Sequence, residues 1–169
     1  MWVGAFMDRL ILLRHGKAEN ESASGEDFDR RLAPRGVRES TEMGETLARL
    51  GLIPDLALVS PAARAQETWA AAAEAAFPKA QSRLEPELYN ADSGTVRQAA
   101  EAAGRGCGTL IVVGHNPGLQ ELTLQLLMEG SAPAQLIGKA RQFPTAAAAV
   151  FLIDANGRPA FDGLFFPER

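Results

Sequence analysis

The chain of 169 residues has the length of one domain, which we expect to span residues 1–169. Its 17 Lys and Arg against 21 Asp and Glu give a net charge of −4. This charge argues against a nucleic-acid partner but leaves room for a local cationic pocket. The chain has one cysteine, Cys107, and two histidines, His15 and His115. These numbers exclude an internal disulfide and a thiolate or histidine-rich metal site.

No segment of the sequence predicts a membrane span or a secretion signal. The longest apolar run, residues 146–153, is shorter than the ~20 residues that cross a bilayer. The apolar part of the N-terminal stretch MWVGAFMDR is too short for a signal peptide. We therefore expect a soluble, cytoplasmic protein without a membrane partner.

The first half of the chain alternates aliphatic runs with helical stretches. Residues 10–13 (LILL) and 56–59 (LALV) are short and continuous, as is typical of strands covered on both faces. Between them, residues 34–50 have apolar side chains at helical spacing, and Gly51 follows, a common residue after a helix end. Ser60-Pro61 predicts an N-cap and a proline in the first helical position, and so a helix from there to Phe77.

The second half continues the alternation and then changes character. We predict a helix over residues 93–103, a buried strand over 110–113 (LIVV) and a helix after Asn116-Pro117. Strands that alternate with helices predict an α/β fold, here a three-layer sandwich with a largely parallel central sheet flanked by helices. Residues 146–154 and 160–166 surround Asn156-Gly157, which predicts a C-terminal antiparallel hairpin attached to the sheet or lying at its edge.

Both histidines follow directly after a predicted buried strand. The two segments read LILL-Arg14-His15-Gly16 and LIVV-Gly114-His115-Asn116-Pro117. Ligands of open α/β sheets bind outside the carboxyl ends of the strands. A single histidine is more often a surface or core residue than a functional one, but two in the same position, with no others in the chain, favour a site.

The residues around the histidines predict an anion pocket. Arg14 has a guanidinium fork suited to phosphate oxygens, and Gly16 allows backbone N–H groups to approach an anion closely. Arg64 falls in the first turn of a helix, where a cation opposes the helix dipole unless an anion binds there. A solvated side chain, or an ion pair with Glu67 or Glu74, is the alternative for this arginine. Taken together, four side chains would converge on a phosphoryl group, with one histidine as the nucleophile: Arg14, His15, Arg64 and His115.

Other phosphate chemistries lack their motifs. The chain has no G-x-x-x-x-G-K-[ST] loop and no G-x-S-x-G elbow. The glycine-rich segment 104–108 precedes a strand, so we interpret it as a turn, and Cys107 has no arginine six positions later to form a cysteine-phosphatase loop. Asp27-x-Asp29 lies in the polar segment 19–31, which indicates a loop or a disordered insert. We interpret these aspartates as a pair that faces Arg30 or Arg31.

Three motifs together resemble the histidine phosphatase superfamily, also called phosphoglycerate mutase-like. They are Arg14-His15-Gly16, Ser60-Pro61-x-x-Arg64-Ala65-x-x-Thr68 and Val113-Gly114-His115-Asn116-Pro117. Each comes at a strand end, and with their strands and helices they cover residues 10–127. The short chain, with Asp29-Arg30-x-Leu32-x-Pro34-x-Gly36 and Pro86-Glu87-Leu88, is most similar to the SixA-type phosphohistidine phosphatase branch.

The resemblance implies roles for the four pocket residues. His15 is the nucleophile that becomes phosphorylated, and Arg14, Arg64 and His115 bind the phosphate. In the implied two-step reaction, neutral His15 attacks phosphorus and water then hydrolyses the phosphohistidine. A backbone carbonyl should hold the other ring N–H of His15. Because fixed cations take the part that magnesium has in other phosphoryl transfer enzymes, we expect no metal and no cofactor.

The sequence departs from the family pattern at three places. Ala33 stands where the resemblance leads us to expect threonine, so any hydroxyl contact there is missing. Lys17 follows the RHG motif at a position where the family varies. The general acid, a glutamate in mutase-like members, has Glu87 as its candidate, with Glu85 or an ordinary acidic loop as the alternatives.

Two classes of function follow from these observations. The first is a phosphatase that acts on phosphohistidine of a protein partner, or alternatively on a small phosphorylated metabolite; a mutase is disfavoured because few insertions could hold a diphosphorylated intermediate. The second is a non-catalytic phosphate-binding module, against which His15 itself argues, because phosphate binding requires no nucleophile. The segments expected to cover the pocket, residues 17–33 and 85–94, are short. They predict an open pocket that admits a phosphorylated side chain of another protein.

Overall fold

A computed structural model describes residues 7–169; most of the N-terminal stretch considered for a signal peptide, residues 1–6, lies outside the described part. The fold is organised around one six-stranded sheet, in the order β3-β2-β4-β1-β5-β6. Its strands are β1 (Arg9–Arg14), β2 (Leu56–Val59), β3 (Gln81–Leu84), β4 (Thr109–Gly114), β5 (Ala148–Ile153) and β6 (Pro159–Phe165). The first four strands pair in parallel, whereas β5 pairs antiparallel with β1 and β6 antiparallel with β5. The α/β class and the C-terminal hairpin predicted from the sequence are confirmed.

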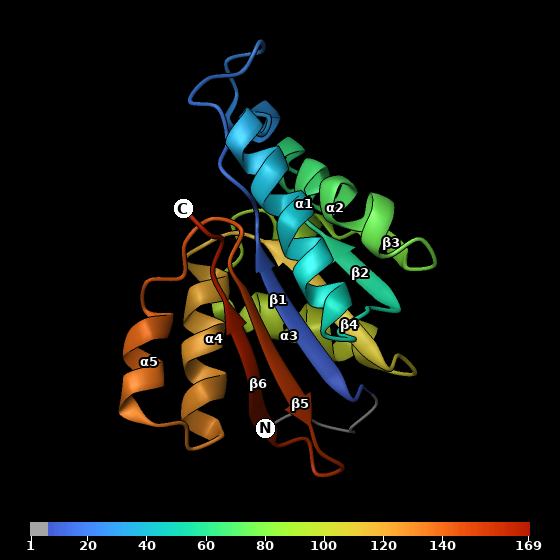
Figure 1. The fold of residues 1–169 in the computed structure, drawn as a ribbon, viewed down its shortest axis with the longest axis vertical. Coiled ribbons are helices and arrows are strands. Elements are labelled where there is room, and N and C mark those ends of the chain that lie inside the picture. Colours follow the sequence, from blue (N-terminus) through green and yellow to red (C-terminus); the bar gives the residue numbers. More distant parts are fainter. Residues whose placement is uncertain (1–6) are drawn as a thin grey trace.

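Helices cover both faces of this sheet, as Figure 1 shows. The helices are α1 (Pro34–Arg49), α2 (Ala63–Ala76), α3 (Ser93–Gly104), α4 (Gly118–Glu129) and α5 (Ala134–Ala140), with short 3-10 helices η1 (Asp27–Asp29) and η2 (Pro86–Leu88). Helices α1 and α2 pack on one face, α3 and α4 on the other, and α5 lies beside α4. The expected three layers are therefore present. No helix of the described residues is long and apolar enough to span a membrane.

The aliphatic runs contribute to two hydrophobic cores, one on each face of the sheet. Along β1, Leu10 and Leu12 pack toward α3 and α4, whereas Ile11 and Leu13 pack toward α1 and α2. All four side chains are fully buried. This arrangement explains why the run has no polar alternation, since a strand covered on both faces has no solvent-facing side.

Three local features differ from the sequence-based predictions or were missed by them. Helix α2 begins at Ala63 and not at Pro61, and the hydroxyl of Ser60 accepts the N–H of Ala62 at 3.3 Å in the turn before it. Strand β3 was not predicted, because the four side chains of this edge strand are all exposed. Helix α5 also escaped prediction, since its seven residues give a weak periodic signal.

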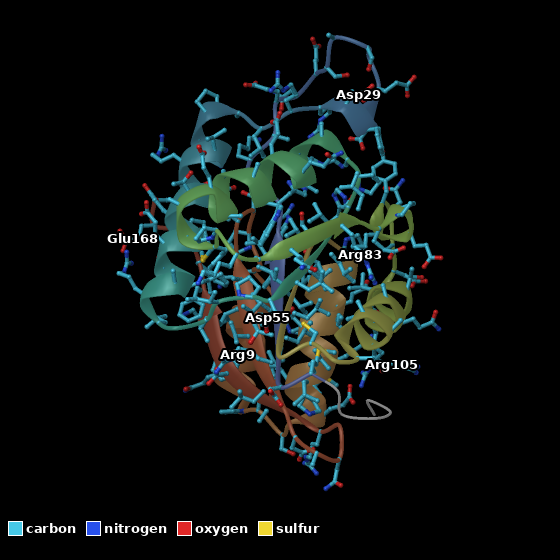
Figure 2. The ribbon with its side chains drawn as sticks, turned by 90° about the vertical axis from the view of Figure 1, so that its right-hand side faces the viewer. Arg9, Asp29, Asp55, Arg83, Arg105 and Glu168 are labelled. Atoms are coloured by element: carbon cyan, nitrogen blue, oxygen red, sulfur yellow. The ribbon has the colours of Figure 1, made fainter. Side chains whose placement is uncertain are left out.

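The carboxyl ends of the parallel strands lie at one edge of the sheet, and short segments extend beyond them. The segment 17–33, which includes η1, forms the blue loop at the top of Figure 1. Figure 2 shows Asp29 of this segment at one end of the molecule, far along the long axis from Arg9, where β1 begins. Side chains that follow β1, β2 and β4 are therefore brought to the same edge.

Candidate active site

The sheet brings the two histidines into contact. Strands β1 and β4 pair in register, with Arg14 opposite Gly114, so the residues that directly follow the two strands, His15 and His115, lie next to each other. Their ring centroids are 5.2 Å apart, and each residue is 8% exposed. The position expected from the strand ends is the one the structure shows.

His15 is held as a neutral ring with one free nitrogen. Its Nδ1 lies 2.7 Å from the carbonyl oxygen of Gly16, so Nδ1–H donates to this oxygen and Nε2 keeps its lone pair. Burial, with the nearby charges of His115, Arg64 and Arg14 adding to it, lowers the pKa of His15 to about 3, although the bond to Gly16 acts in the opposite direction. The ring is therefore unprotonated at neutral pH, the form in which an imidazole acts as a nucleophile.

His115 is anchored by the strand next to its own. Its Nε2 lies 2.7 Å from the hydroxyl of Ser60, the residue after β2. Burial and the charge of Arg64 lower the pKa of His115 to about 4, against an opposing effect of Asp27. Its Nδ1 is buried and has no hydrogen-bond partner among the described residues. The serine that the sequence suggested as a helix cap thus also orients a pocket histidine.

Arg14 is fixed by a carbonyl from a distant part of the chain. Its Nη1 donates to the carbonyl oxygen of Phe143 at 3.1 Å, and the side-chain amide of Asn116 donates to the same oxygen at 3.0 Å. Its Nε is buried and unpaired within the described part of the chain. Buried polar groups without partners are rare and are expected where a polar ligand binds, and here Arg14 Nε and His115 Nδ1 belong to the same site.

Arg64 lies in the first turn of α2, and its side chain is 8% exposed. Its Nη1 donates to the backbone oxygen of Asp27 at 2.9 Å and its Nη2 to the Asp27 carboxylate at 3.1 Å. The ion pairs considered from the sequence do not form: Glu67 instead binds Arg31 and the N–H of Leu32. Arg64 is thus directed to the strand-end pocket and the loop beyond it.

Gly16 and Thr68 join the first two motifs. The N–H of Gly16 donates to the hydroxyl of Thr68 at 2.9 Å, and this hydroxyl donates to the carbonyl of Arg64 at 2.7 Å. A Cβ atom on Gly16 would lie 2.7 Å from the backbone oxygen of Gly36. The structure therefore shows a packing reason for the glycine, and the N–H expected to face an anion donates to Thr68 instead.

Two residues of the site were not found in the sequence. The hydroxyl of Tyr89 donates to the Asp27 carboxylate at 2.7 Å, and the Tyr89 ring meets that of His115 edge-on at 5.8 Å. Phe28 packs edge-on against the same tyrosine at 5.0 Å. Of the two aspartates predicted to face Arg30 or Arg31, Asp27 pairs with Arg30 at 3.2 Å, whereas Asp29 accepts from Ser24. The sequence gave no signal for the contacts of Asp27 with Arg64 and Tyr89.

Glu87, the candidate general acid predicted from the sequence, lies apart from these contacts. Glu87 is in η2, is exposed, and forms no hydrogen bond or ion pair with the described residues. Glu85 precedes η2, and its N–H donates to the carbonyl of Val59. At the other two departures from the family pattern, Ala33 caps α1 without a side-chain bond, and Lys17 is exposed. No group of three or more metal-ligating side chains was found among residues 7–169.

Comparison with known proteins identifies the class to which this fold and site belong. Residues 10–103 match the family described as the histidine phosphatase superfamily, branch 1, and the chain belongs to this family. An uncharacterized protein of Mycobacterium tuberculosis is 33% identical over 142 residues, which are 83% of this chain and 87% of that protein.

Solved structures narrow the family to one branch. SixA of Agrobacterium tumefaciens, a candidate phosphohistidine phosphatase, superposes with a TM-score of 0.83 and 30% identity over 96% of this chain and 99% of its own. The protein histidine phosphatase SixA has a TM-score of 0.75 and 26% identity, covering 93% of this chain and 96% of its own. The chain is therefore of the SixA type, which supports a phosphatase activity.

Proposed function

We propose that the protein is a phosphatase that forms a phosphohistidine intermediate on His15 and acts on phosphohistidine of a protein partner. The observation that carries this proposal is the state of His15: a neutral ring whose Nδ1–H is held by Gly16, with Nε2 free beside two arginines and a second histidine. A site built only to bind phosphate would have the cations without a desolvated nucleophile.

The reaction has two steps at the same phosphorus. Nε2 of His15 attacks, the bond from phosphorus to the leaving group breaks, and its electron pair departs with that group. Water then attacks the phosphorus of the phosphohistidine and loses a proton as the O–P bond forms; the P–N bond breaks, and its electron pair returns to Nε2. Arg14, Arg64 and His115 stabilise the charge on the phosphoryl oxygens in both steps, since their positions are fixed before substrate binds.

The choice of a protein substrate rests on the shape of the rim, which we define as residues 17–33 and 85–94. These segments are short and carry exposed side chains such as Phe28 and Glu87. An open pocket gives a small metabolite few contacts, whereas a protein brings further contacts of its own. The SixA relatives support this choice, because one is a protein histidine phosphatase solved in complex with tungstate, a tetrahedral oxyanion shaped like phosphate.

A comparison of substrates tests the proposal. The purified protein is incubated in EDTA with a peptide or protein carrying phosphohistidine and with a panel of alkyl phosphomonoesters and sugar phosphates. We expect the highest kcat/KM for phosphohistidine, because the phosphoramidate bond breaks readily once its nitrogen is protonated. Equal kcat/KM on both substrate types, or a strong preference for one sugar phosphate, would contradict the choice of substrate while leaving the nucleophile untouched.

A further inference from the structure

One carboxylate contacts the cationic pocket, which we define as Arg14, His15, Arg64 and His115. Oδ2 of Asp27 accepts from Arg64 at 3.1 Å and from Tyr89 at 2.7 Å, and Oδ1 accepts from Arg30 at 3.2 Å. Within the described part of the chain, no other carboxylate forms a hydrogen bond or ion pair with a residue of this pocket.

The position of Asp27 is that of a group at the mouth of the pocket. Its side chain is 50% exposed, whereas that of its partner Arg64 is 8% exposed. Tyr89, which holds the carboxylate, also touches the ring of His115. Asp27 therefore lies between the buried Arg64 and the solvent.

Building on the proposed function, we propose that Asp27 is the proton-transfer residue of the reaction. In the first step, its carboxyl group gives a proton to the leaving atom as the bond from phosphorus to that atom breaks. In the second step, the resulting carboxylate takes a proton from the attacking water as the oxygen–phosphorus bond forms and the P–N bond breaks. Each cycle thus returns Asp27 to its starting state, as expected when leaving group and water occupy one position.

The surroundings of Asp27 permit both protonation states. The hydrogen bond from Tyr89 and the charges of Arg64 and Arg30 hold the pKa of Asp27 below the usual range, so the group is the carboxylate that the second step needs. A phosphoryl dianion on Arg64 would place negative charge beside this carboxylate. Like charges at one site raise the pKa of a carboxyl group, and Asp27 would take up the proton that the first step needs.

The chain offers a matched control two residues away from Asp27. Asp29 belongs to the same short helix, η1, but its carboxylate accepts from Ser24 at 2.7 Å and from no pocket residue. Asp29 is labelled at the outer end of the molecule in Figure 2. Asp29→Asn therefore makes the same chemical change in the same turn without touching the pocket.

The experiment compares Asp27→Asn, Asp29→Asn and wild type on two aryl phosphates. Phenyl phosphate has a poor leaving group that depends on a proton donor, and 4-nitrophenyl phosphate has a good one that does not. We expect Asp27→Asn to lower kcat/KM for phenyl phosphate by about a hundredfold or more, and for 4-nitrophenyl phosphate by less than about tenfold. Asp29→Asn should match wild type on both.

A second measurement follows the intermediate. With 4-nitrophenyl phosphate, Asp27→Asn should form the phosphohistidine quickly but hydrolyse it slowly, because water lacks its base. A burst of nitrophenolate and base-stable, acid-labile phosphate on the protein should then appear. Tyr89→Phe keeps Asp27 but removes the hydroxyl that binds its carboxylate. This variant should show a smaller burst and less phosphate on the protein than Asp27→Asn.

Two outcomes would overturn the role of Asp27. If Asp27→Asn lowered kcat/KM equally for the two aryl phosphates, Asp27 would only position Arg64. If inorganic phosphate inhibited Asp27→Asn more tightly than wild type and the leaving group had no effect, Asp27 would only compete with the substrate for Arg64. Neither result affects the proposed function, provided that wild type still labels His15. Absence of label in wild type would instead refute the proposed function.

Discussion

The cationic pocket and the rim are built in different ways, although they meet at Arg64. The pocket residues lie at or directly after the ends of buried parallel strands or in the first turn of a helix, and three of the four are 7–8% exposed. The rim is held by side-chain bonds such as that from Tyr89 to the half-exposed Asp27. Under our proposals, the pocket fixes where charge is stabilised, whereas the rim provides in Asp27 a group that gains and loses a proton.

The difference in burial between pocket and rim agrees with the chemistry that we propose for each. Charge stabilisation is most effective when the dipoles and cations do not have to reorganise, and burial also strengthens them. Proton exchange requires contact with water. A pocket with Arg64 buried and Asp27 exposed satisfies both requirements through a single ion pair.

The largest effect should come from the nucleophile in the pocket. We expect His15→Ala to abolish turnover and to carry no label, while its melting temperature stays close to that of wild type, because the side chain follows the strand and is not part of the aliphatic core. Wild-type protein quenched in alkaline denaturant after labelled substrate should carry acid-labile, base-stable label. Label on the His15→Ala variant, or label stable to acid, would remove His15 from this role.

The next effect concerns the arginine that joins pocket and rim. Arg64→Lys should cost about 3 kcal/mol of transition-state stabilisation, or roughly a hundredfold in kcat/KM, since a point charge cannot replace the two-pronged guanidinium. Arg31→Lys is the control, because this arginine also pairs with a carboxylate but is 78% exposed. Near-wild-type rates for both Arg64→Lys and Arg64→Ala would place Arg64 outside the site.

A third prediction tests how tightly the rim is joined to the pocket. A Cβ atom on Gly36 in α1 would lie 2.1 Å from the backbone oxygen of Lys17, where the rim begins. Gly36→Ala should therefore lower the free energy of unfolding by about 2 kcal/mol, as overpacking does, measured by urea titration. Gly138→Ala in α5 meets nothing within 4 Å and should be neutral or slightly stabilising. Equal effects of the two substitutions would show that the contact is not tight.

The pocket histidines should make stability depend on pH. Their pKa values in the folded protein are lowered to about 3 and about 4, below the ~6.5 of an unfolded histidine. Between the folded and the unfolded pKa values, the unfolded chain thus binds more protons than the folded protein. The stability that depends on neutral histidines is therefore complete above about pH 6.5 and is lost as the pH falls.

When the pH falls from 6.5 to 5.5, each histidine should lower the free energy of unfolding by roughly 1 kcal/mol. Urea titrations of wild type, His15→Gln and His115→Gln at the two pH values measure the loss. A wild-type slope that persists in both variants would contradict the assignment of the lowered pKa values to these side chains.

The residues of the pocket could be predicted from the sequence because local sequence patterns indicate their positions. Uninterrupted aliphatic runs mark the buried strands, and Arg14, His15 and His115 come at their ends. The same reasoning missed β3, which is an exposed edge strand, and the orienting carbonyl of Phe143, a backbone group that no residue type reports. It also missed the bond between Asp27 and Tyr89, which are 62 residues apart and meet only because the sheet brings their loops together.

The smallest effect should come from Glu87, the candidate acid suggested by the resemblance. A proton donor must come within hydrogen-bond reach of the leaving atom, and the exposed Glu87 forms no contact with the pocket among the described residues, whereas Asp27 binds Arg64 directly. Glu87→Gln should therefore change kcat/KM by less than about twofold on phosphohistidine and on alkyl phosphomonoesters alike. A loss confined to the phosphomonoesters, whose alkoxide needs a donor more than imidazole does, would restore Glu87 as the acid. It would also mean that η2 moves toward the pocket when substrate binds, so that the rim and not the sheet decides which leaving groups the enzyme accepts.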